Sequence, residues 1–220
     1  ISPMFSRCIA MQARQALERT GGDILELGPG TGVLAADLYA ELKAQGVAPA
    51  RYRLLEVSPE LRERQRALVA ERLPGDIGHF EWIDRLPDRI DGLVVANEVL
   101  DVLPCSLLHR TGGEILERGV VLTEAGFAWD DMALPDGELK RRAAAVIPAG
   151  DYEYLTEVNL AAEALVRSVA AALGRGLAQH LPVLLRRGRL DFFGRHQLGE
   201  ARGVAHFALQ PLLRPGRPGQ

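Results

Sequence analysis

Apolar residues along the first hundred positions follow two spacings, one typical of amphipathic helices and one typical of buried strands. Phe5, Ile9 and Ala13 lie four residues apart, which predicts a helix that begins after a Ser2 cap and ends at Gly21. Short apolar runs bounded by turn residues predict buried strands. Strands are expected at residues 23–27, 52–57, 79–83 and 92–96, and further helices at 31–46 and 59–73.

This alternation of strands and helices is typical of a Rossmann-like α/β fold with a mostly parallel sheet. The pattern changes after residue 105, where three short apolar runs around Leu107, Val120 and Phe127 are separated by glycine-containing turns. These runs predict an antiparallel hairpin or meander inserted into the parallel fold. A polar helix at 136–146, a strand at 152–158 and an alanine-rich helix at 160–173 are expected to follow.

A glycine-rich turn directly follows the first predicted strand and contains Gly28, Gly30 and Gly32. Glycines let the chain turn sharply and let its backbone approach a ligand, while the next helix points free N–H groups at the same place. The third glycine comes two residues after the second, whereas the dinucleotide fingerprint needs it three residues after, where Val33 stands. The loop therefore favours a site for S-adenosylmethionine (SAM) over one for a nicotinamide dinucleotide. A plain strand-to-helix turn is the alternative.

Acidic and aromatic residues near the ends of the next two strands extend this predicted site. Glu56 ends the second strand, where a carboxylate can accept hydrogen bonds from both ribose hydroxyls; a solvated carboxylate is the alternative. Trp82 and Asp84 follow in the third strand and its loop, which flanks the adenine in such folds. Asp84 is expected to accept from the exocyclic amine, and a core tryptophan is the alternative for Trp82.

Three polar residues, Asn97, Glu98 and Asp101, stand between two apolar runs after the fourth strand. Ligands of open α/β sheets bind at the carboxyl ends of strands, so we expect these residues at an active site. The alternative is a helix cap, which accounts for Asn97 and Glu98 but less naturally for Asp101.

Four motifs of the sequence are specific enough to compare with known proteins. They are Ile-Ser-Pro-x-Phe at 1–5, Glu-Leu-Gly-x-Gly-x-Gly at 26–32, Tyr-x₃-Glu-x-Ser-x₂-Leu-x₃-Gln at 52–65, and Asn-Glu-Val-Leu-Asp-x-Leu-Pro at 97–104. These motifs resemble those of the MidA family of SAM-dependent methyltransferases, which includes the mitochondrial arginine methyltransferase of complex I assembly. The resemblance implies SAM as methyl donor, a protein substrate with arginine as acceptor, and a respiratory NADH dehydrogenase subunit as partner.

The same motifs complete the list of predicted site residues. The predicted catalytic residues are Glu98, Asp101 and Asn97. A guanidinium stays protonated in water, so the carboxylates of Glu98 and Asp101 would hold an arginine and direct a nitrogen lone pair at the methyl sulfonium. The predicted cofactor-binding residues are Glu26, Gly28, Gly30, Gly32, Glu56, Ser58, Trp82, Asp84 and Asn97.

The resemblance extends from about Ile1 to about Gly176. Members of the MidA family carry a further stretch before the first motif and a strand that ends in Asp-Tyr-Gly soon after the position of Gly176, and this sequence contains neither. We therefore expect an N-terminally truncated SAM-binding domain at 1–176 and a divergent or disordered tail at 177–220.

Composition narrows the partners and the compartment. The 26 basic and 29 acidic residues give a net charge of −3, which argues against nucleic-acid binding. No apolar run is long enough to span a membrane. Cys8 and Cys105 are far apart and are expected to be buried, which favours a reducing compartment: the cytoplasm, or the mitochondrion in a eukaryote. The five histidines show no metal-ligand spacing, so no metal site is expected.

Three other functions stay open at the level of sequence. The chain could be a catalytically inactive Rossmann domain that acts as an assembly or interaction partner, which the missing Asp-Tyr-Gly segment favours. The glycine loop allows a methyltransferase for small molecules equally well. A nicotinamide-dependent oxidoreductase is disfavoured by Val33.

Overall fold

The computed structural model of this chain describes residues 2–181, which form two compact units. One unit comprises the described residues up to Asn97 together with those from Val169 onward, and the other comprises Glu98–Ser168. The chain thus leaves the first unit after a strand, builds the second unit, and returns. Each unit is described by itself below.

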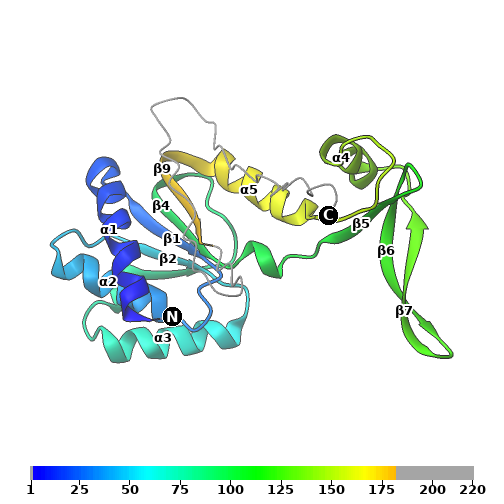
Figure 1. The fold of residues 1–220 in the computed structure, drawn as a ribbon. Coiled ribbons are helices and arrows are strands. Elements are labelled where there is room, and N and C mark those ends of the chain that lie inside the picture. Colours follow the sequence, from blue (N-terminus) through cyan, green and yellow to red (C-terminus); the bar gives the residue numbers. More distant parts are fainter. Residues whose placement is uncertain (1, 182–220) are drawn as a thin grey trace, which may run out of the picture. The chain divides into compact units, whose positions relative to one another are not determined.

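A five-stranded parallel sheet, here called sheet A, lies at the centre of the first unit. Its strand order is β3-β2-β1-β4-β9, and every neighbouring pair is parallel (Figure 1). This confirms the predicted Rossmann-like α/β class. The strands are β1 (Asp23–Leu27), β2 (Tyr52–Leu55), β3 (Phe80–Ile83), β4 (Ile90–Asn97) and β9 (Leu173–Leu181).

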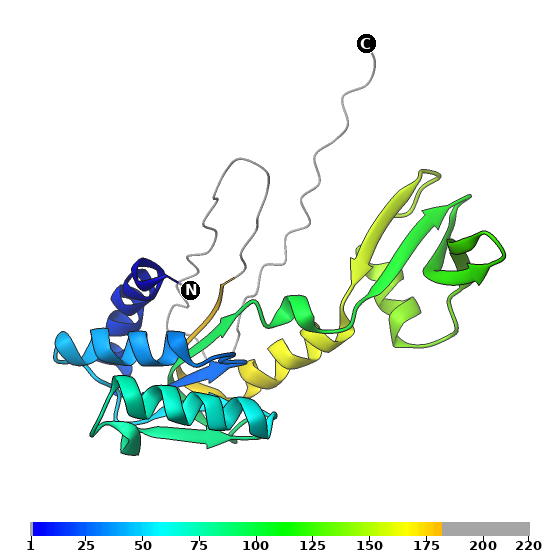
Figure 2. The ribbon, with the colours of Figure 1, turned by 90° about the horizontal axis from the view of Figure 1, so that it is seen from below.

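Three helices, α1 (Pro3–Thr20), α2 (Val33–Ala44) and α3 (Pro59–Arg72), pack against one face of sheet A, with α2 and α3 side by side (Figure 2). Helices α1 and α3 begin as their sequences predict, since Ser2 and Ser58 accept hydrogen bonds from backbone N–H groups in the first turn and a proline follows each serine. A 3-10 turn, η1 (Ile77–His79), leads into β3, and α5 (Leu160–Ala172) leads into β9. The core beneath the helices includes Ile9, Leu34, Leu38, Tyr39, Tyr52, Leu54, Val69 and Leu93.

Glycines stand where the strands of sheet A come closest together, near their amino ends. Gly92 has a φ of 130°, and a Cβ built there would lie 1.9 Å from the carbonyl oxygen of Asp23. A Cβ on Gly176 would lie 2.1 Å from the carbonyl oxygen of Gly92, and one on Gly22 would lie 2.1 Å from that of Asp91. These positions therefore exclude any side chain, and glycine is required by contact with neighbouring backbone.

Strand β9 was not predicted from the sequence. It pairs with β4 from Leu173 to Leu181, so residues 177–181, assigned above to a divergent tail, instead extend the edge of the parallel sheet. Two glycines interrupt its apolar pattern, and its formation depends on pairing with a strand far away in sequence. The rest of the predicted tail, 182–220, lies outside the described residues.

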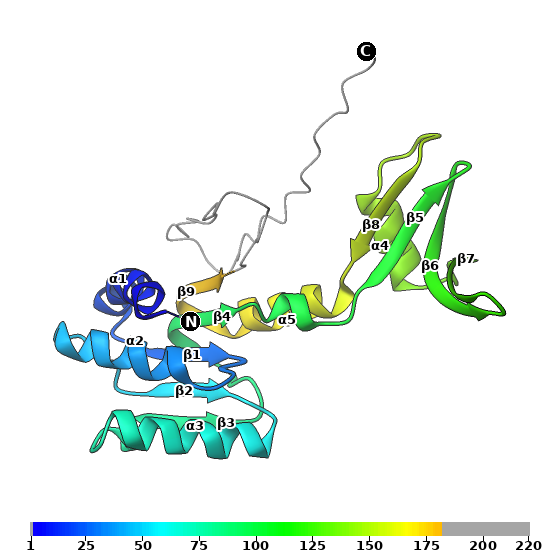
Figure 3. The same ribbon diagram turned by 60° about the horizontal axis from the view of Figure 1, so that its bottom comes forward.

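The second unit contains a four-stranded antiparallel sheet, here called sheet B, with the order β7-β6-β5-β8 (Figure 3). The predicted inserted hairpin is confirmed, and the strand expected at 152–158 pairs with it rather than with sheet A. The strands are β5 (Ser106–Thr111), β6 (Glu114–Thr123), β7 (Gly126–Ala133) and β8 (Tyr154–Val158), preceded by a 3-10 turn, η2 (Leu100–Val102).

The two faces of sheet B differ in burial. One face packs Leu108 and Val158 against Ala143 and Ile147, which belong to α4 (Glu138–Val146) and its C-terminal cap. On the β6–β7 ribbon, two cross-strand pairs stay exposed, with Phe127 showing 83% of its surface. These pairs are Val120 with Trp129 and Leu122 with Phe127.

Both cysteines are exposed, so the expectation that they are buried was wrong. Cys8 lies on α1 beside the residues that face the core, and Cys105 directly precedes β5. The helical periodicity of α1 places Ile9 and Ala13 inward and leaves Cys8 outward. Across residues 2–181, no helix combines the length and the apolar character needed to cross a membrane.

Candidate functional site

The register of sheet A brings several predicted residues into one row at the carboxyl ends of its strands. Leu27 of β1 pairs with Leu55 of β2 and with Ala96 of β4, so the next residues in each strand are neighbours. Leu55 in turn pairs with Ile83 of β3. The row that follows these pairs is Asp84, Glu56, Gly28 and Asn97.

The glycine loop occupies the middle of this row. Gly28, Gly30 and Gly32 have φ values of 57°, 55° and 81°, a left-handed conformation that side chains disfavour. A Cβ on Gly30 would meet nothing within 4 Å, so the loop borders open space at that residue. Gly32 is the N-cap of α2 and has no side chain with which to cap the first backbone N–H groups. The loop therefore has the free space and the free donors that an anionic or polar ligand needs.

The Glu56 carboxylate is held by a backbone donor on one oxygen and a side-chain donor on the other. Its Oε1 accepts from the backbone N–H of Ser58 at 2.9 Å, and its Oε2 accepts from Nε2 of Gln65 at 3.2 Å. The residue is 7% exposed. A buried carboxylate with a donor on each oxygen is fixed in orientation, and each oxygen keeps a lone pair for a further donor. The alternative of a solvated carboxylate is thereby wrong, and Ser58 serves both as helix cap and as a backbone donor.

Gln65 is a site residue that the sequence reasoning did not single out, although it ends one of the quoted motifs. It lies on α3, is fully buried, and donates from Nε2 to the carbonyl oxygen of Gly30 at 2.7 Å as well as to Glu56. Its Oε1 accepts from Nε1 of Trp82 at 2.9 Å. A glutamine nine residues after a strand-end acid gives no sign by itself of contacting a loop 35 residues earlier.

Trp82 and Asp84 differ in their surroundings. Trp82 is half-buried, packs against the core, and has the guanidinium of Arg66 4.7 Å from its ring centre. Trp82 therefore packs against the core, as the alternative interpretation expected, and it also lies next to the row of residues at the carboxyl ends of the strands. Asp84 is exposed directly after β3. Contact of either residue with an adenine stays a prediction.

Glu26 lies behind the glycine loop, inside the core. It is 2% exposed, and its Oε2 accepts a hydrogen bond of 2.6 Å from the hydroxyl of Tyr52, which is itself fully buried. Burial raises the pKa of Glu26 to about 7, and the hydrogen bond from Tyr52 opposes this shift. The structure therefore gives Glu26 a partner inside the protein, and its predicted contact with a cofactor stays untested.

Asn97 ends β4 beside Gly28, and its Oδ1 atom is buried without a hydrogen-bond partner among the described residues. An orphaned buried acceptor costs free energy unless a ligand or water satisfies it, so this atom marks a place for a donor. The helix-cap alternative does not hold for Asn97, because η2 has Val99 as its N-cap.

Glu98 and Asp101 open the second unit. Glu98 is exposed and has a φ of 55°, the one positive φ outside glycine in the part of the chain that the structure describes. A non-glycine residue in this conformation costs about 1–2 kcal/mol and is concentrated at functional sites. Asp101 is exposed within η2. Both carboxylates are thus accessible to solvent.

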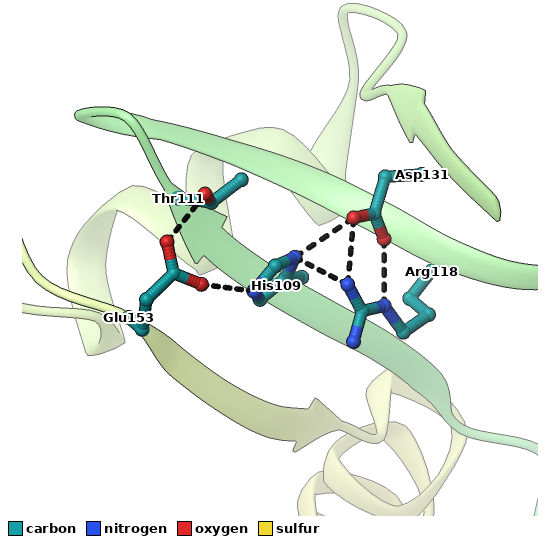
Figure 4. Close-up of polar contacts among 5 residues, drawn as sticks. All are labelled: His109, Thr111, Arg118, Asp131 and Glu153. Atoms are coloured by element: carbon teal, nitrogen blue, oxygen red, sulfur yellow. Dashed lines mark hydrogen bonds and ion pairs between the residues drawn. The ribbon is translucent and has the colours of Figure 1, made fainter. Parts of the chain in front are cut away.

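A second cluster of polar side chains lies on sheet B (Figure 4). His109 contacts Asp131 through Nδ1 at 2.8 Å and Glu153 through Nε2 at 2.6 Å, and Arg118 pairs with Asp131 at 2.7 Å. The hydrogen bond to Asp131 raises the pKa of His109, partial desolvation lowers it, and Glu153 adds a smaller rise. Thr111 donates to Glu153 at 2.5 Å. These contacts tie three neighbouring strands and the residue before β8 together.

The rest of the described chain offers weaker candidates for a site. A hollow of about 260 Å³ lies at the amino ends of β1 and β2, the edge opposite the glycine loop, and carries a single charged residue, Glu18. Between Ser2 and Leu181, no three His, Cys, Asp or Glu side chains converge in a way that could hold a metal ion. The carboxyl edge of sheet A is therefore the candidate site.

Known proteins resemble this chain over most of its length. Residues 6–181 match a family described as "Putative S-adenosyl-L-methionine-dependent methyltransferase". The crystal structure of a COG1565 superfamily member from Burkholderia thailandensis bound to S-adenosyl-homocysteine is 39% identical, with a TM-score of 0.71 over 82% of this chain and 46% of that one. A native structure of a COG1565 superfamily protein from the same organism is 38% identical, with a TM-score of 0.73 over 81% and 48%.

The chain spans a little under half the length of these two proteins. No curated protein matches it.

Proposed function

This chain belongs to the family of SAM-dependent methyltransferases, and we propose that it transfers the methyl group of SAM to an arginine side chain of a protein. The observation that carries the proposal is the row at the carboxyl edge of sheet A: a glycine loop with open space at Gly30, the fixed carboxylate of Glu56, and the orphaned Oδ1 of Asn97. A nicotinamide dinucleotide fits less well, because Val33 stands where its fingerprint needs glycine.

Three residues of the row and the neighbouring Gly30 are proposed to bind separate chemical groups of SAM. Glu56 offers two oriented oxygens for the two ribose hydroxyls, and Asn97 offers an acceptor for the ammonium of the methionine part. Gly28 and Gly30 let backbone approach the ligand without a Cβ in the way. When bound, SAM supplies an electrophilic methyl group on a sulfonium. The protein's part is then to orient the acceptor in line with that methyl group and to exclude water.

Glu98 and Asp101 are proposed to hold the acceptor. Glu98 follows Asn97 in the chain, so its Cα lies about 3.8 Å from the Cα of a row residue whatever the placement of the second unit. Its positive φ supports a functional role, since the residue next to the row adopts a strained backbone conformation of a kind that is concentrated at functional sites. Two carboxylates can bind a guanidinium through paired hydrogen bonds and leave one nitrogen directed at the methyl group. One of these carboxylates would accept the proton that this nitrogen loses as its bond to the methyl carbon replaces the bond from sulfur.

The protein substrate and the partner follow from the MidA resemblance. We propose a subunit of a respiratory NADH dehydrogenase as the methylated protein. The specific support is the Asn-Glu-Val-Leu-Asp-x-Leu-Pro motif at 97–104, which includes both proposed acceptor-binding carboxylates. A screen of methyl transfer from radiolabelled SAM to the purified enzyme complex and to unrelated proteins tests this assignment.

Cofactor binding is tested by calorimetric titration with S-adenosylhomocysteine, using Gly30→Ala and Gly46→Ala as a matched pair. Both glycines have positive φ, and a Cβ on either would meet nothing within 4 Å. Both variants should thus lose a similar amount of stability, about 1 kcal/mol. Gly30→Ala should weaken binding at least about tenfold, because its methyl group enters the ligand's space, while Gly46→Ala should bind normally. A folded wild-type chain that does not bind would overturn the proposal.

The acceptor role is tested by Glu98→Gln. The amide keeps the shape but removes the negative charge that a guanidinium needs, so methyl transfer should fall by about 100-fold or more with the affinity for S-adenosylhomocysteine unchanged. Glu124→Gln, in an exposed turn of sheet B, is the control for loss of one charge. Full activity of Glu98→Gln would refute the role.

A further inference from the structure

Gln65 contacts three parts of the candidate cofactor site at once. Its amide joins the glycine loop through Gly30, the end of β2 through Glu56, and β3 through Trp82. Its side chain also packs closely against the loop, since a Cβ on Gly32 would lie 3.1 Å from Cγ of Gln65. Three separate segments of sheet A's carboxyl edge therefore depend on one side chain.

The orientation of the Gln65 amide is fixed by the chemistry of its partners. A backbone carbonyl and a carboxylate only accept, so they face the NH₂ group; the indole N–H only donates, so it faces the oxygen. Both N–H groups and the carbonyl are used, and the side chain is fully buried. A buried polar group that is satisfied in this way is rigid, whereas a change at any one partner leaves another group unpaired.

We infer that Gln65 is a positioning residue for the cofactor's ribose: it acts through Glu56, which it holds so that both carboxylate oxygens face a vicinal diol. This inference rests on the proposed function and deepens it. Ser58 fixes Oε1 from the backbone, which no substitution of a side chain removes, whereas Gln65 provides the side-chain donor to Oε2. Without Gln65 the carboxylate can rotate about its terminal torsion, and the two ribose hydroxyls are no longer met together.

The inference predicts a change in ligand discrimination rather than in affinity alone. Wild-type protein should bind S-adenosylhomocysteine at least about tenfold more tightly than its 2′-deoxy analogue, because the analogue lacks the hydroxyl that would donate to the remaining lone pair of one Glu56 oxygen. Gln65→Met keeps the length of the side chain but has no N–H donor. In this variant the ratio of the two dissociation constants should fall to within about threefold. Glu56→Gln should lower the same ratio.

Two controls separate positioning from general destabilisation. Val69→Ala removes buried volume from the same face of α3, one turn further on, and should lower stability with the ratio unchanged. Gln65→Glu keeps the volume and the acceptor for Trp82 but has no N–H donor, and when ionised it has no donor at all. Protonation of the introduced carboxyl group restores one donor, so lowering the pH should raise the ratio in this variant and leave it low in Gln65→Met.

Tryptophan fluorescence provides an independent readout. The sequence has two tryptophans, so Trp129→Phe leaves Trp82 as the sole emitter. Loss of the hydrogen bond from its indole in Gln65→Met should shift the emission of Trp82, whereas Val69→Ala should not.

The outcomes of this experiment are distinct. Equal weakening of both ligands by Gln65→Met, with the ratio kept, would mean that Gln65 supports the loop only and would overturn the inference alone. A wild-type protein that binds neither ligand would overturn the proposed function as well.

Discussion

Sheet A and sheet B hold their polar side chains in opposite ways. At the carboxyl edge of sheet A, Glu26, Glu56 and Gln65 are almost fully buried and are satisfied by a few specific donors and acceptors. On sheet B, His109, Asp131 and their partners form a denser network that is only partly shielded from solvent. Burial makes each contact in sheet A consequential, since an unmade buried hydrogen bond costs far more than a screened surface ion pair. We therefore expect a single substitution to change the stability of the protein strongly in sheet A and only slightly in sheet B.

The largest difference in stability between the two sheets is expected when one glycine in each sheet is changed to alanine. Gly92→Ala in β4 would place a methyl group 1.9 Å from the backbone oxygen of Asp23, at a φ of 130°. Gly119→Ala in β6 would place it 3.6 Å from the flexible end of Met132, an ordinary contact. Urea unfolding should show a loss of at least about 3 kcal/mol for Gly92→Ala and a change within about 0.5 kcal/mol for Gly119→Ala. Comparable losses would mean that sheet A tolerates backbone shifts as readily as sheet B.

A medium effect is expected from removing the buried charge of Glu26. Because its pKa in the folded protein is raised to about 7, the folded state holds this proton more tightly than the unfolded state, so the stability falls as pH rises from about 4.5 to 7. Glu26→Gln keeps an acceptor for Tyr52 and removes this titration. Relative to wild type, the variant should be equally stable near pH 4.5 and gain roughly 3 kcal/mol above pH 7.

Urea unfolding at several values between about pH 5 and pH 8 measures this difference. Glu60→Gln, on the exposed face of α3, is the control and should show no such gain. A difference between Glu26→Gln and wild type that does not change with pH would show that Glu26 stays ionised in the folded protein.

The smallest effect is expected from His109→Gln on sheet B. The pKa of His109 is raised, chiefly by its hydrogen bond to Asp131, so its contribution is fully present below the ordinary pKa of about 6.5 and is lost as pH rises through the higher folded value. Thermal melts should show a Tm lowered by only about 2 °C near pH 5.5, since solvent and Arg118 moderate the loss, and the difference from wild type should shrink as the pH rises. A larger loss at the higher pH than at the lower one would contradict this sign.

The local features of the molecule could be predicted from sequence, because neighbouring residues determine them. The serine caps, the glycine loop between a strand and a helix, and the turns at Gly112 and Gly126 all follow from residue types at fixed spacings. The parallel class of sheet A and the inserted hairpin follow from the alternation of apolar runs. Glu56 was placed correctly at the end of β2 because its position in a parallel fold decides its neighbours.

The features that could not be predicted depend on contacts between distant segments. Gln65 reads as one more polar residue of an exposed helix, and its burial follows from where α3 meets the glycine loop. Strand β9 contains two glycines, and its strand conformation depends on pairing with β4. The partner of Glu26 is Tyr52 on the adjacent strand, which no local pattern indicates. Roles in binding and catalysis stay predictions for each of these residues.

The position of the second unit within the chain has a consequence for how the protein folds. Strand β9 joins the edge of sheet A beside β4, yet it is synthesised only after the whole of residues 98–168. The first four strands of sheet A are complete before then, so β9 must dock late, onto an edge that stays open during translation. Loop-closure entropy grows slowly, by about 0.6 kcal/mol for each doubling of length. Inserts of very different size between β4 and β9 are therefore nearly equivalent in thermodynamic terms, and evolution could exchange this unit while the strands of sheet A stay the same.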